Sequence, residues 1–294
     1  MSKKGLFVGL CGLDVVFYED KPLPVEDVKM KCSDLRACIG GPAANAAITY
    51  TLLGGEATVV SYIGNSSVGK VIKQMMADLG IAVVDLCLDD DVKCISSIYV
   101  NTTNATRTIF SGRNEIHSLT EFDILEENIA ECDFVLYDGH FSHVDDVLLE
   151  GCKKMSKDIV IDVGGWKDSF NNILKYDPTL ICSAVFNRDG LDGIALQQEF
   201  GYDKVAITRG SKSIVYKTLD MTAPAEIEVL TVNAIDTLGA GDVFHGAYCY
   251  FKYVKELSFA GALANAMQVA AASTTVFGVI NGVNHYISSK GHNN

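Results

Sequence analysis

The residue types best suited to chemistry lie together in the stretch AIDTLGAGDVFHGA of this 294-residue chain. A strand-like segment ends there, a loop of small residues follows (Gly239, Ala240 and Gly241), and a helical pattern begins at Asp242. Unpaired backbone N–H groups and the dipole at a helix N-terminus bind anions, and glycine lets a phosphate approach closely. The pattern predicts an anion site beside a carboxylate, which is most of what phosphoryl transfer to an alcohol requires. A Gly-rich turn with Asp242 as helix cap is the alternative.

A second stretch, YIGNSSVGKV, matches most of a nucleotide-binding loop. Gly64, Gly69 and Lys70 fit the pattern G-x-x-x-x-G-K, and an apolar run precedes them. Val71 stands where such a loop has the Ser or Thr whose hydroxyl binds Mg²⁺. The missing hydroxyl favours the alternative in which Lys70 is a solvated lysine at the start of a helix.

The composition argues against several classes of function. The net charge is -13 and no Lys/Arg cluster occurs, which argues against binding to nucleic acid or to anionic membranes. No apolar stretch approaches the roughly 18 residues that a membrane span needs. The nine cysteines form no C-x-x-C pair, so we expect free thiols in a cytoplasmic protein and no zinc site.

Short apolar runs bounded by Gly or Asp alternate with helical patterns along the chain. This alternation predicts an α/β fold with a doubly wound, mostly parallel sheet flanked by helices. The runs are GLFVGL, ATVVSYI, FVLYDG, IVIDVG, SAVF and KVAIT. We expect residues 1–294 to form one domain, with a helical C-terminal third and frayed last residues, SSKGHNN.

Two segments, residues 15–38 and 93–113, interrupt this alternation. They are rich in β-branched and alternating residues and contain turn signals such as NTTN. We expect antiparallel strands that form a small β-sheet lid over an active site, and an edge extension of the main sheet is the alternative. Because a lid of exposed strands often pairs with a second lid, we also expect a homodimer through this sheet.

Two long motifs resemble the signatures of the ribokinase-like (PfkB) carbohydrate kinase family. DTLGAGDVFHGA resembles D-T-x-G-A-G-D, and CIGGPAANAAITYTLLGG resembles G-G-x-x-x-N-x-A followed by a helix. Asp14 in CGLDVVF and the segment AITRGSKSIVY resemble two further family segments, in the family order. The resemblance implies the ribokinase-like fold and a kinase that uses ATP and Mg²⁺.

The resemblance also implies roles for the matched residues. Asp242 is expected to be the base that takes the proton from the acceptor hydroxyl, while the amides of residues 239–242 hold the transferring phosphoryl group. Carboxylates, carboxamides and exposed backbone read polyols through hydrogen bonds. Contacts to the sugar hydroxyls are expected from Asp14, Gly40, Gly41 and Asn45.

The same resemblance implies a nucleotide site. It locates Thr208 and Gly210 at the border of the nucleotide, Asn265 by the adenine, and Asn187 near Mg²⁺ and phosphate. Asp236 matches a position that helps to form a monovalent-cation loop in relatives, which implies K⁺, and a simple loop cap is the alternative.

Three positions depart from the family pattern. Gly190 stands where a Glu linked to Mg²⁺ is expected, so Asp189 or water would carry the metal instead. Ser213 stands where the second Gly of the nucleotide turn is common, and DVGGW lacks an Arg that is often found in the family.

The expected lid carries two arginines, Arg107 and Arg113. An arginine there could hold a carboxylate, phosphate or sulfonate of the substrate through two parallel hydrogen bonds, and an arginine in solvent is the alternative. GGPAA, DVFHGA and the Gly at position 190 also resemble the sulfofructose kinase branch of the family.

The expected activity is transfer of the γ-phosphoryl group of ATP to a primary hydroxyl of a sugar or sugar derivative. One alternative is a nucleoside kinase of the same fold, which the polar segment NTTNATR disfavours because a base needs an apolar lid. Another is a catalytically weak sugar-binding or regulatory protein, which Gly190 favours and the intact Asp242 opposes. We expect Asp242 to be ionised at neutral pH without a raised pKa, because a helix N-terminus favours its charge.

Overall fold

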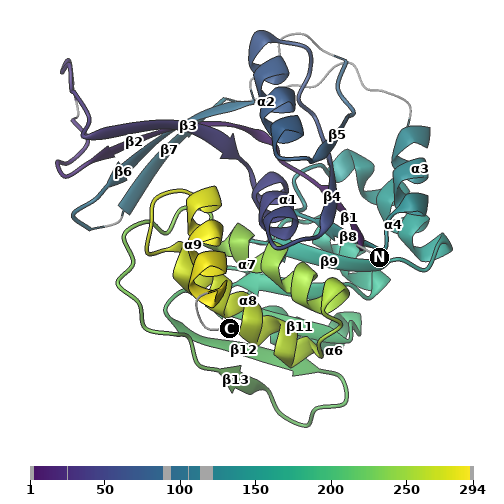
Figure 1. The fold of residues 1–294 in the computed structure, drawn as a ribbon. Helices are drawn as coiled ribbons and strands as arrows, with labels where there is room; N and C mark the ends of the chain where they lie inside the picture. The colour runs from purple at the N-terminus through teal and green to yellow at the C-terminus, as the bar shows by residue number, and fades with distance from the viewer. Residues whose placement is uncertain (1–2, 25, 89–93, 105, 113–121, 292–294) are drawn as a thin grey trace.

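The computed structural model describes residues 3–24, 26–88, 94–104, 106–112 and 122–291. In this part of the chain, nine strands form one large twisted sheet with helices on both faces, and four more strands form a small sheet that projects from it (Figure 1). The predicted doubly wound α/β fold is therefore confirmed.

The large sheet is parallel except at one edge, where β11, β12 and β13 pair antiparallel. Its strands, in spatial order, are β13 (Ala225–Ile227), β12 (Lys212–Thr218), β11 (Lys204–Arg209), β10 (Thr179–Ser183), β9 (Asp158–Val163), β8 (Phe134–Tyr137), β1 (Lys4–Val8), β4 (Glu56–Ser61) and β5 (Ala82–Asp85). Because the central strands are parallel, their carboxyl ends lie along one edge of the sheet, where ligands of open α/β folds bind.

Two helix layers cover the large sheet. Alternate side chains of β1 enter different cores, with Phe7 on one side and Leu6 and Val8 on the other. One face carries α1 (Pro42–Leu52), α2 (Ser67–Asp78), α7 (Ala240–Cys249), which continues as a π-helical turn (Tyr250–Val254), α8 (Phe259–Ser273) and α9 (Val279–Gly291). The other face carries α3 (Asp123–Glu131), α4 (Asp145–Lys154), α5 (Phe170–Ile173) and α6 (Gly193–Phe200), with 3₁₀ turns at Ser142–Val144 and Leu174–Tyr176.

The small sheet has the strand order β3 (Asp34–Gly40), β2 (Gly12–Glu19), β6 (Ile95–Asn101) and β7 (Thr106–Ser111). It comes from the two segments that interrupt the βα alternation. The pairs β2–β3 and β6–β7 are antiparallel as expected, but β2 and β6 run parallel. One face packs a small core of Val16, Tyr18, Ile98 and Val100 against Leu238 and Phe277 of the main body.

Three local expectations differ from the structure. The run SAVF predicts a strand, yet β10 ends at Ser183 and residues 184–187 turn away from the sheet. Helix α7 begins at Ala240, two residues before the expected start, because Gly239 already has a helix-capping conformation. Helix α9 continues to Gly291 through most of the segment expected to fray. None of the helices in the described ranges is long and apolar enough to cross a membrane.

Candidate active site

The loop before α7 has open backbone amides at a helix N-terminus. Gly239 is the N-cap with φ 74°, a left-handed conformation that favours glycine. A Cβ on Gly239 would lie 2.7 Å from Cγ2 of Val279, whereas a Cβ on Gly241 would have no neighbour within 4 Å. The space over Gly241 can therefore admit an anion to the amides at the start of the helix.

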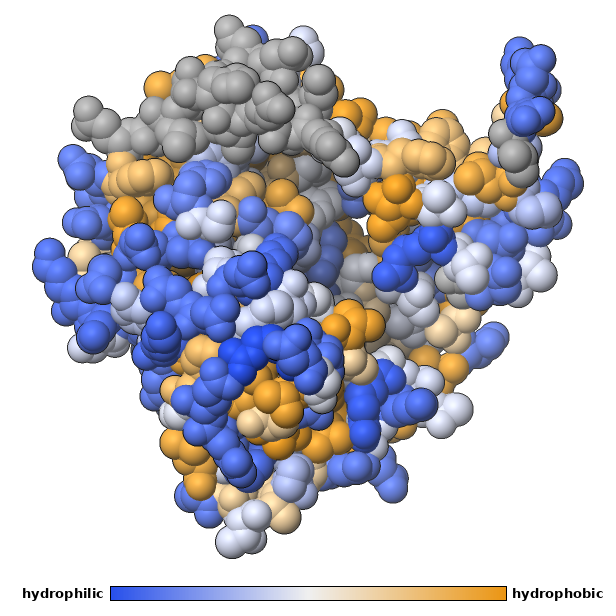
Figure 2. Space-filling model, turned by 180° about the vertical axis from the view of Figure 1, so that it is seen from behind, coloured by the Kyte–Doolittle hydropathy of each residue, from blue (hydrophilic) through white to orange (hydrophobic). Residues whose placement is uncertain are grey.

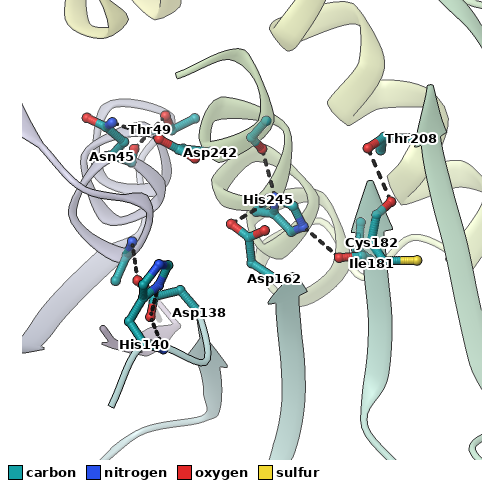
Figure 3. A network of polar contacts seen from close by, with 12 residues as sticks. Asn45, Thr49, Asp138, His140, Asp162, Ile181, Cys182, Thr208, Asp242 and His245 are labelled. Atoms are coloured by element: carbon teal, nitrogen blue, oxygen red, sulfur yellow. Dashed lines mark hydrogen bonds and ion pairs between the residues drawn. The ribbon is translucent and has the colours of Figure 1, made fainter. Parts of the chain in front are cut away.

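Asp242 lies in the first turn of α7 and is half-buried. Asn45 of α1 donates a hydrogen bond of 2.8 Å from Nδ2 to Oδ2 of Asp242, across a separation of 197 residues in sequence. This contact joins the two long motifs of the sequence analysis at one point (Figure 3). It holds one carboxylate oxygen and leaves Oδ1 for another partner.

The ionisation of Asp242 differs from the expectation. Burial raises its pKa to about 7, and the nearby carboxylate of Asp162 adds to the rise. Asn45 and His245 oppose it through a hydrogen bond and a positive charge. The expectation of an unshifted pKa is wrong because it considered only the helix N-terminus and not the carboxylates that other strands bring nearby.

A buried polar network lies beneath the first turn of α7 (Figure 3). Asp162 at the end of β9 contacts the ring of His245, and His245 also contacts the carbonyl oxygens of Gly241 and Ile181. Neither Asp162 nor His245 was predicted from the sequence. A polar residue at the carboxyl end of an apolar strand run, IVIDV, was the available signal.

Asp138 organises the neighbouring loop and was also missed. At the end of β8 its Oδ2 accepts hydrogen bonds from the backbone N–H of Leu10 at 2.8 Å and of Ala43 at 3.3 Å. Its Oδ1 accepts one from the backbone N–H of His140 at 3.1 Å. These bonds fix the start of α1, which carries Asn45, relative to β1.

A cavity of about 400 Å³ lies between the small sheet, α1 and the start of α9. Its polar lining residues are Asp14, Arg36, Asn45, Asp236 and Asn281, and its apolar ones include Tyr18, Ile39, Ile48, Leu238, Val279 and Ile280. Asn45 therefore borders both this cavity and Asp242.

Asp14 faces this cavity from β2. Burial raises its pKa to about 6, opposed by a hydrogen bond from Ser96. A Cβ on Gly40 would lie 2.0 Å from Oδ2 of Asp14, so only glycine at this position leaves the carboxylate its place. The structure thus places Gly40 beside Asp14, and Asp14 and Asn45 line one cavity, whereas their contacts to a sugar stay a prediction.

Arg36 is the arginine that lines the cavity, and the sequence analysis did not identify it. Its Nε is 2.7 Å from Asp34, and its Nη1 donates to the carbonyl oxygen of Phe277 at 3.1 Å. The guanidinium also lies over the rings of Tyr18 and Phe277. These contacts fix the plane of the guanidinium at the cavity wall.

Arg107 is exposed on β7 and is not among the lining residues of this cavity. It lies instead with Val100 beside residues 235–238, which lead into the loop of residues 239–242 at the start of α7, called the anion loop below. Arg113 lies outside the described residues. Arg36 is therefore better placed than Arg107 to meet a substrate in the cavity, because Asp14 and Asn45 line the same space.

Asp236 is buried and accepts three hydrogen bonds. Leu238 N–H donates to Oδ1 at 3.0 Å, while the hydroxyl of Tyr18 and the N–H of Gly278 donate to Oδ2, each at 3.0 Å. Three donors suit the ionised carboxylate of Asp236, which ties the small sheet to the anion loop and to the segment before α9. These bonds favour the loop-cap alternative for Asp236, and its role in binding a monovalent cation stays a prediction.

Three of the four residues expected at the nucleotide lie along the carboxyl edge of β10 and β11, and the fourth, Asn265, lies on α8. Thr208 Oγ1 donates to the carbonyl oxygen of Cys182 at 3.3 Å, and Gly210 is exposed in the turn that follows β11. Asn187 is exposed in the loop after β10. Asn265 of α8 is half-buried, and its Nδ2 donates to the carbonyl oxygen of Gly261 in its own helix, at 2.8 Å.

The departure at Gly190 has a local structural reason. Asp189 and Gly190 have φ of 54° and 89° between Arg188 and Leu191, which bond to each other in both directions. Such a tight turn with two left-handed residues favours Asp-Gly. Asn187 Oδ1 accepts the N–H of Gly190 at 2.8 Å and braces the turn.

Ser213 is held by Arg209, which donates to its carbonyl oxygen and to its Oγ, each at 2.6 Å. Arg209 also lies 3.3 Å from Glu226 on β13. This cluster fixes the hairpin between β11 and β12 that borders the expected nucleotide site. The hydroxyl of Ser213 therefore accepts a hydrogen bond from Arg209 that a glycine at this position could not accept.

Lys70 is exposed in the first turn of α2. The helix is capped by Ser66, whose Oγ accepts the N–H of Gly69 at 3.0 Å. A Cβ on Gly69 would lie 2.4 Å from the carbonyl oxygen of Gly64, so the two glycines of the loop-like pattern pack against each other. These contacts favour a capped helix start over a phosphate site.

Comparison with known proteins gives a family. Residues 2–161 and 187–285 match the family model described as pfkB family carbohydrate kinase. A ribokinase from Dictyostelium discoideum is 22% identical over 303 residues, which cover 92% of this chain and 94% of that protein.

Solved structures share the whole fold. A protein of Agrobacterium tumefaciens, provisionally named a ribokinase, has a TM-score of 0.84 at 21% identity and covers 99% of this chain and 97% of its own. Ribokinase of Arabidopsis thaliana, complexed with ribose and ATP, has a TM-score of 0.75 at 18% identity, with 98% of each chain covered. At these identities the similarity shows the fold.

Proposed function

The chain belongs to the pfkB family of carbohydrate kinases, and from this we propose that it transfers the γ-phosphoryl group of ATP to a primary hydroxyl of a sugar or sugar derivative. The chain is thus an ATP-dependent kinase of this family, and the finer statement concerns the acceptor. The acceptor lies in the cavity between the small sheet and the main body. The small sheet acts as a lid of a single domain and covers the acceptor during transfer.

The contact between Asn45 and Asp242 carries this proposal. Asn45 is 6% exposed, and its Nδ2 holds Asp242. Its Oδ1 is buried without a hydrogen-bond partner among the described residues, although the residue lines the cavity. A buried acceptor without a partner is costly, so an acceptor hydroxyl that donates to Oδ1 would satisfy it.

The transfer step follows from this arrangement. The acceptor oxygen forms a bond to the γ-phosphorus while the bond from that phosphorus to the bridging oxygen breaks, and ADP leaves. The hydroxyl proton passes to Oδ1 of Asp242, because Asn45 already occupies Oδ2. The amides of residues 239–242 bind the phosphoryl oxygens in transit through hydrogen bonds and the helix dipole.

ATP would bind along the edge formed by Thr208, Gly210 and the loop after β10. In the part of the chain that the structure describes, no group of three or more His, Cys, Asp or Glu side chains could hold a metal ion. This fits Mg²⁺, which keeps several waters and binds mainly to substrate phosphates. Asn187 and Asp189 would meet the hydrated ion, which lowers the charge repulsion on the phosphates.

The choice of acceptor depends on the cavity wall. The polar NTTN segment, which argued against a nucleoside, forms the exposed turn between β6 and β7 and is not among the lining residues. Val279, Ile280 and Ile48 give the cavity an apolar side opposite Asp14. This side keeps a nucleoside kinase as a second candidate, since a base would pack there.

A transfer assay against a panel of acceptors tests the proposal. The panel contains neutral sugars, sugar acids, sugar phosphates and nucleosides, with ATP and Mg²⁺ and detection of ADP. We expect turnover with at least one sugar or sugar derivative. Turnover with nucleosides alone would favour the second candidate. Saturable sugar binding without any transfer would favour a binding or regulatory protein.

A homodimer through the small sheet is a further part of the proposal. On the face opposite Asp14 and Tyr18, Leu35 is 59% and Phe110 57% exposed. Figure 2 shows hydrophobic side chains on the projecting sheet. A second copy is the occupant, because two such faces could bury their apolar surface against each other. A mass in solution that corresponds to the monomer alone would contradict the dimer. Phe110→Glu should dissociate a dimer.

We place the protein in the cytoplasm. No C-x-x-C pair occurs in the sequence, and six of the nine cysteines are buried. Buried cysteines in this pattern suit a reducing compartment.

A further inference from the structure

His245 lies beneath the first turn of α7, and three oxygen atoms surround its ring (Figure 3). Nδ1 lies 2.8 Å from the carbonyl oxygen of Gly241 and 3.3 Å from Oδ2 of Asp162. Nε2 lies 3.1 Å from the carbonyl oxygen of Ile181. The side chain is 5% exposed, so water has little access to either nitrogen.

The two carbonyl contacts determine the protonation of the ring. A backbone carbonyl oxygen only accepts hydrogen bonds, so each ring nitrogen must donate one. A neutral imidazole has one N–H, and its second nitrogen would direct a lone pair at a buried carbonyl oxygen. The imidazolium satisfies both contacts, and Asp162 then supplies the carboxylate that a buried cation requires.

Three charged or titratable side chains act on Asp242, namely Asp138, Asp162 and His245. His140 acts on Asp162, and Asp14 and Arg36 line the neighbouring cavity, which Asn45 borders. Helix α1 contributes only the uncharged Asn45. Asp162 and Asp138 disfavour the ionised form of Asp242, whereas His245 favours it. Burial raises the pKa of Asp162 itself, and His245 opposes that rise.

We propose that His245 is a positioning residue that acts as a buried imidazolium. It joins the Gly241 carbonyl to β9 and β10, which fixes the amides of the anion loop, and it offsets the charge of Asp162 so that Asp242 can ionise as the base. Neither ring nitrogen faces the cavity lining, so His245 exchanges no proton with the acceptor. The effect on catalysis rests on the proposed role of Asp242, whereas the ionisation of His245 does not.

Nitrogen NMR of the wild-type protein tests the ionisation directly. The protein is labelled with ¹⁵N-histidine, and the His245 signals are assigned by replacing each of the other five histidines in turn by glutamine. We expect both ring nitrogens of His245 to carry hydrogen at pH 7.5. One nitrogen without hydrogen would overturn the proposal, whether or not a substrate is known.

The pH profile of kcat/KM tests the effect on Asp242. Loss of the positive charge in His245→Asn should move the acidic limb upward by about one pH unit or more, because the base then holds its proton more tightly. Asp162→Asn should move the limb downward, because a negative neighbour is lost. The double variant should lie between the two. His143→Asn, an exposed histidine away from the site, is the control and should leave the limb in place.

A purely structural His245 gives a different pattern. Both single variants would then lower kcat at every pH, and neither would move the acidic limb. That outcome would overturn the proposal. If His245→Asn does not fold, Asp162→Asn and the NMR measurement still decide, because a limb that stays in place in Asp162→Asn contradicts the electrostatic argument.

Discussion

The two sheets of the molecule use charge in different ways. At the carboxyl edge of the large sheet, Asp138 and His245 are buried and Asp162 is half-buried within a network of fixed polar contacts. On the small sheet, Asp14 and Arg36 are only partly covered and line an open cavity. In our proposal the large sheet therefore offers a preorganised site for phosphoryl transfer, and the small sheet offers the groups that meet the acceptor.

This difference separates the residues that we expect to act on the chemical step from those that we expect to act on binding of the acceptor. Preorganised charges act on the transition state, because they need no rearrangement when the reaction occurs. Groups on a projecting sheet contact the acceptor before and during the reaction, so they chiefly set its binding. Variants of the large sheet should change kcat, whereas variants of the small sheet should change KM.

The largest effect is expected for Asp242→Asn. The variant keeps the size of the side chain and removes the base, and proton acceptance by a positioned base contributes about 10²–10⁴-fold. We expect kcat to fall by that factor, with ATP affinity kept or slightly improved because a negative charge is gone. Single-turnover kinetics and calorimetry measure the two parts. A near-native kcat would mean that the base lies elsewhere.

The same variant, Asp242→Asn, should lose activity but gain stability relative to the wild type at high pH. The pKa of Asp242 is raised to about 7 in the folded protein, above the 3.8 of the free side chain. Ionisation of Asp242 therefore lowers the free energy of unfolding of the wild type as pH rises from about 4 through 7. We expect the Tm of Asp242→Asn, relative to wild type, to be higher at pH 8 than at pH 4. An equal difference at both pH values would contradict a raised pKa.

A smaller effect is expected for Arg36→Ala on the small sheet. If the acceptor carries an anion, the variant loses a charge-assisted contact of roughly 1.5–3 kcal/mol, which is about a tenfold to hundredfold rise in KM. The value of kcat should change little. Arg107→Ala is the matched control and should leave KM nearly unchanged. Equal losses for charged and neutral acceptors would show that Arg36 only supports Phe277.

A modest effect is expected for Tyr18→Phe, which tests the link between the two sheets. The variant removes the hydroxyl that donates to buried Asp236, so the lid is less firmly held to the anion loop. We expect a several-fold loss in kcat/KM and a lower Tm, since hydrogen bonds to charged groups contribute about 1.5–3 kcal/mol. Tyr99→Phe is the control, because Tyr99 lies on the opposite face of the same sheet and donates to the backbone carbonyl oxygen of Lys21 instead of to Asp236. Equal losses of kcat/KM in Tyr18→Phe and Tyr99→Phe would contradict a role for the hydrogen bond between Tyr18 and Asp236.

No effect is expected for Lys70→Ala. Lys70 is exposed in a capped helix start and contacts no part of the candidate site among the described residues. Turnover and ATP affinity should stay within about twofold of wild type. A hundredfold fall in kcat of the folded variant would restore the nucleotide-loop interpretation of the stretch from Gly64 to Lys70.

Much of the fold could be predicted because its signals are local. Apolar runs bounded by Gly or Asp identify most strands of the large sheet, and two interruptions of the βα pattern identify the small sheet. The run SAVF misled because only Phe186 is buried in the core, whereas Ala184 and Val185 are exposed in a turn after β10. Local hydrophobicity does not distinguish a strand from a buried turn.

The site could be predicted only in part, for the same reason. The anion loop and Asp242 adjoin each other in sequence, so spacing alone predicts their proximity. The role of Arg36 and the position of Arg107 could not be predicted, because strand order and register together decide which side chains of the small sheet reach the cavity. Arg36 shares a sheet face with Asp14 only through the register of β2 and β3.

The sequence by itself therefore determined the fold class, the helix N-terminus that can bind an anion, and the carboxylate beside it, since all three depend on short-range spacing. The tertiary structure alone decided the charge of that carboxylate. Asn45, Asp138 and Asp162 come from distant parts of the chain and meet Asp242 at the edge of the large sheet. Burial and Coulomb interaction depend on distance in space, so no local pattern in the sequence reveals them.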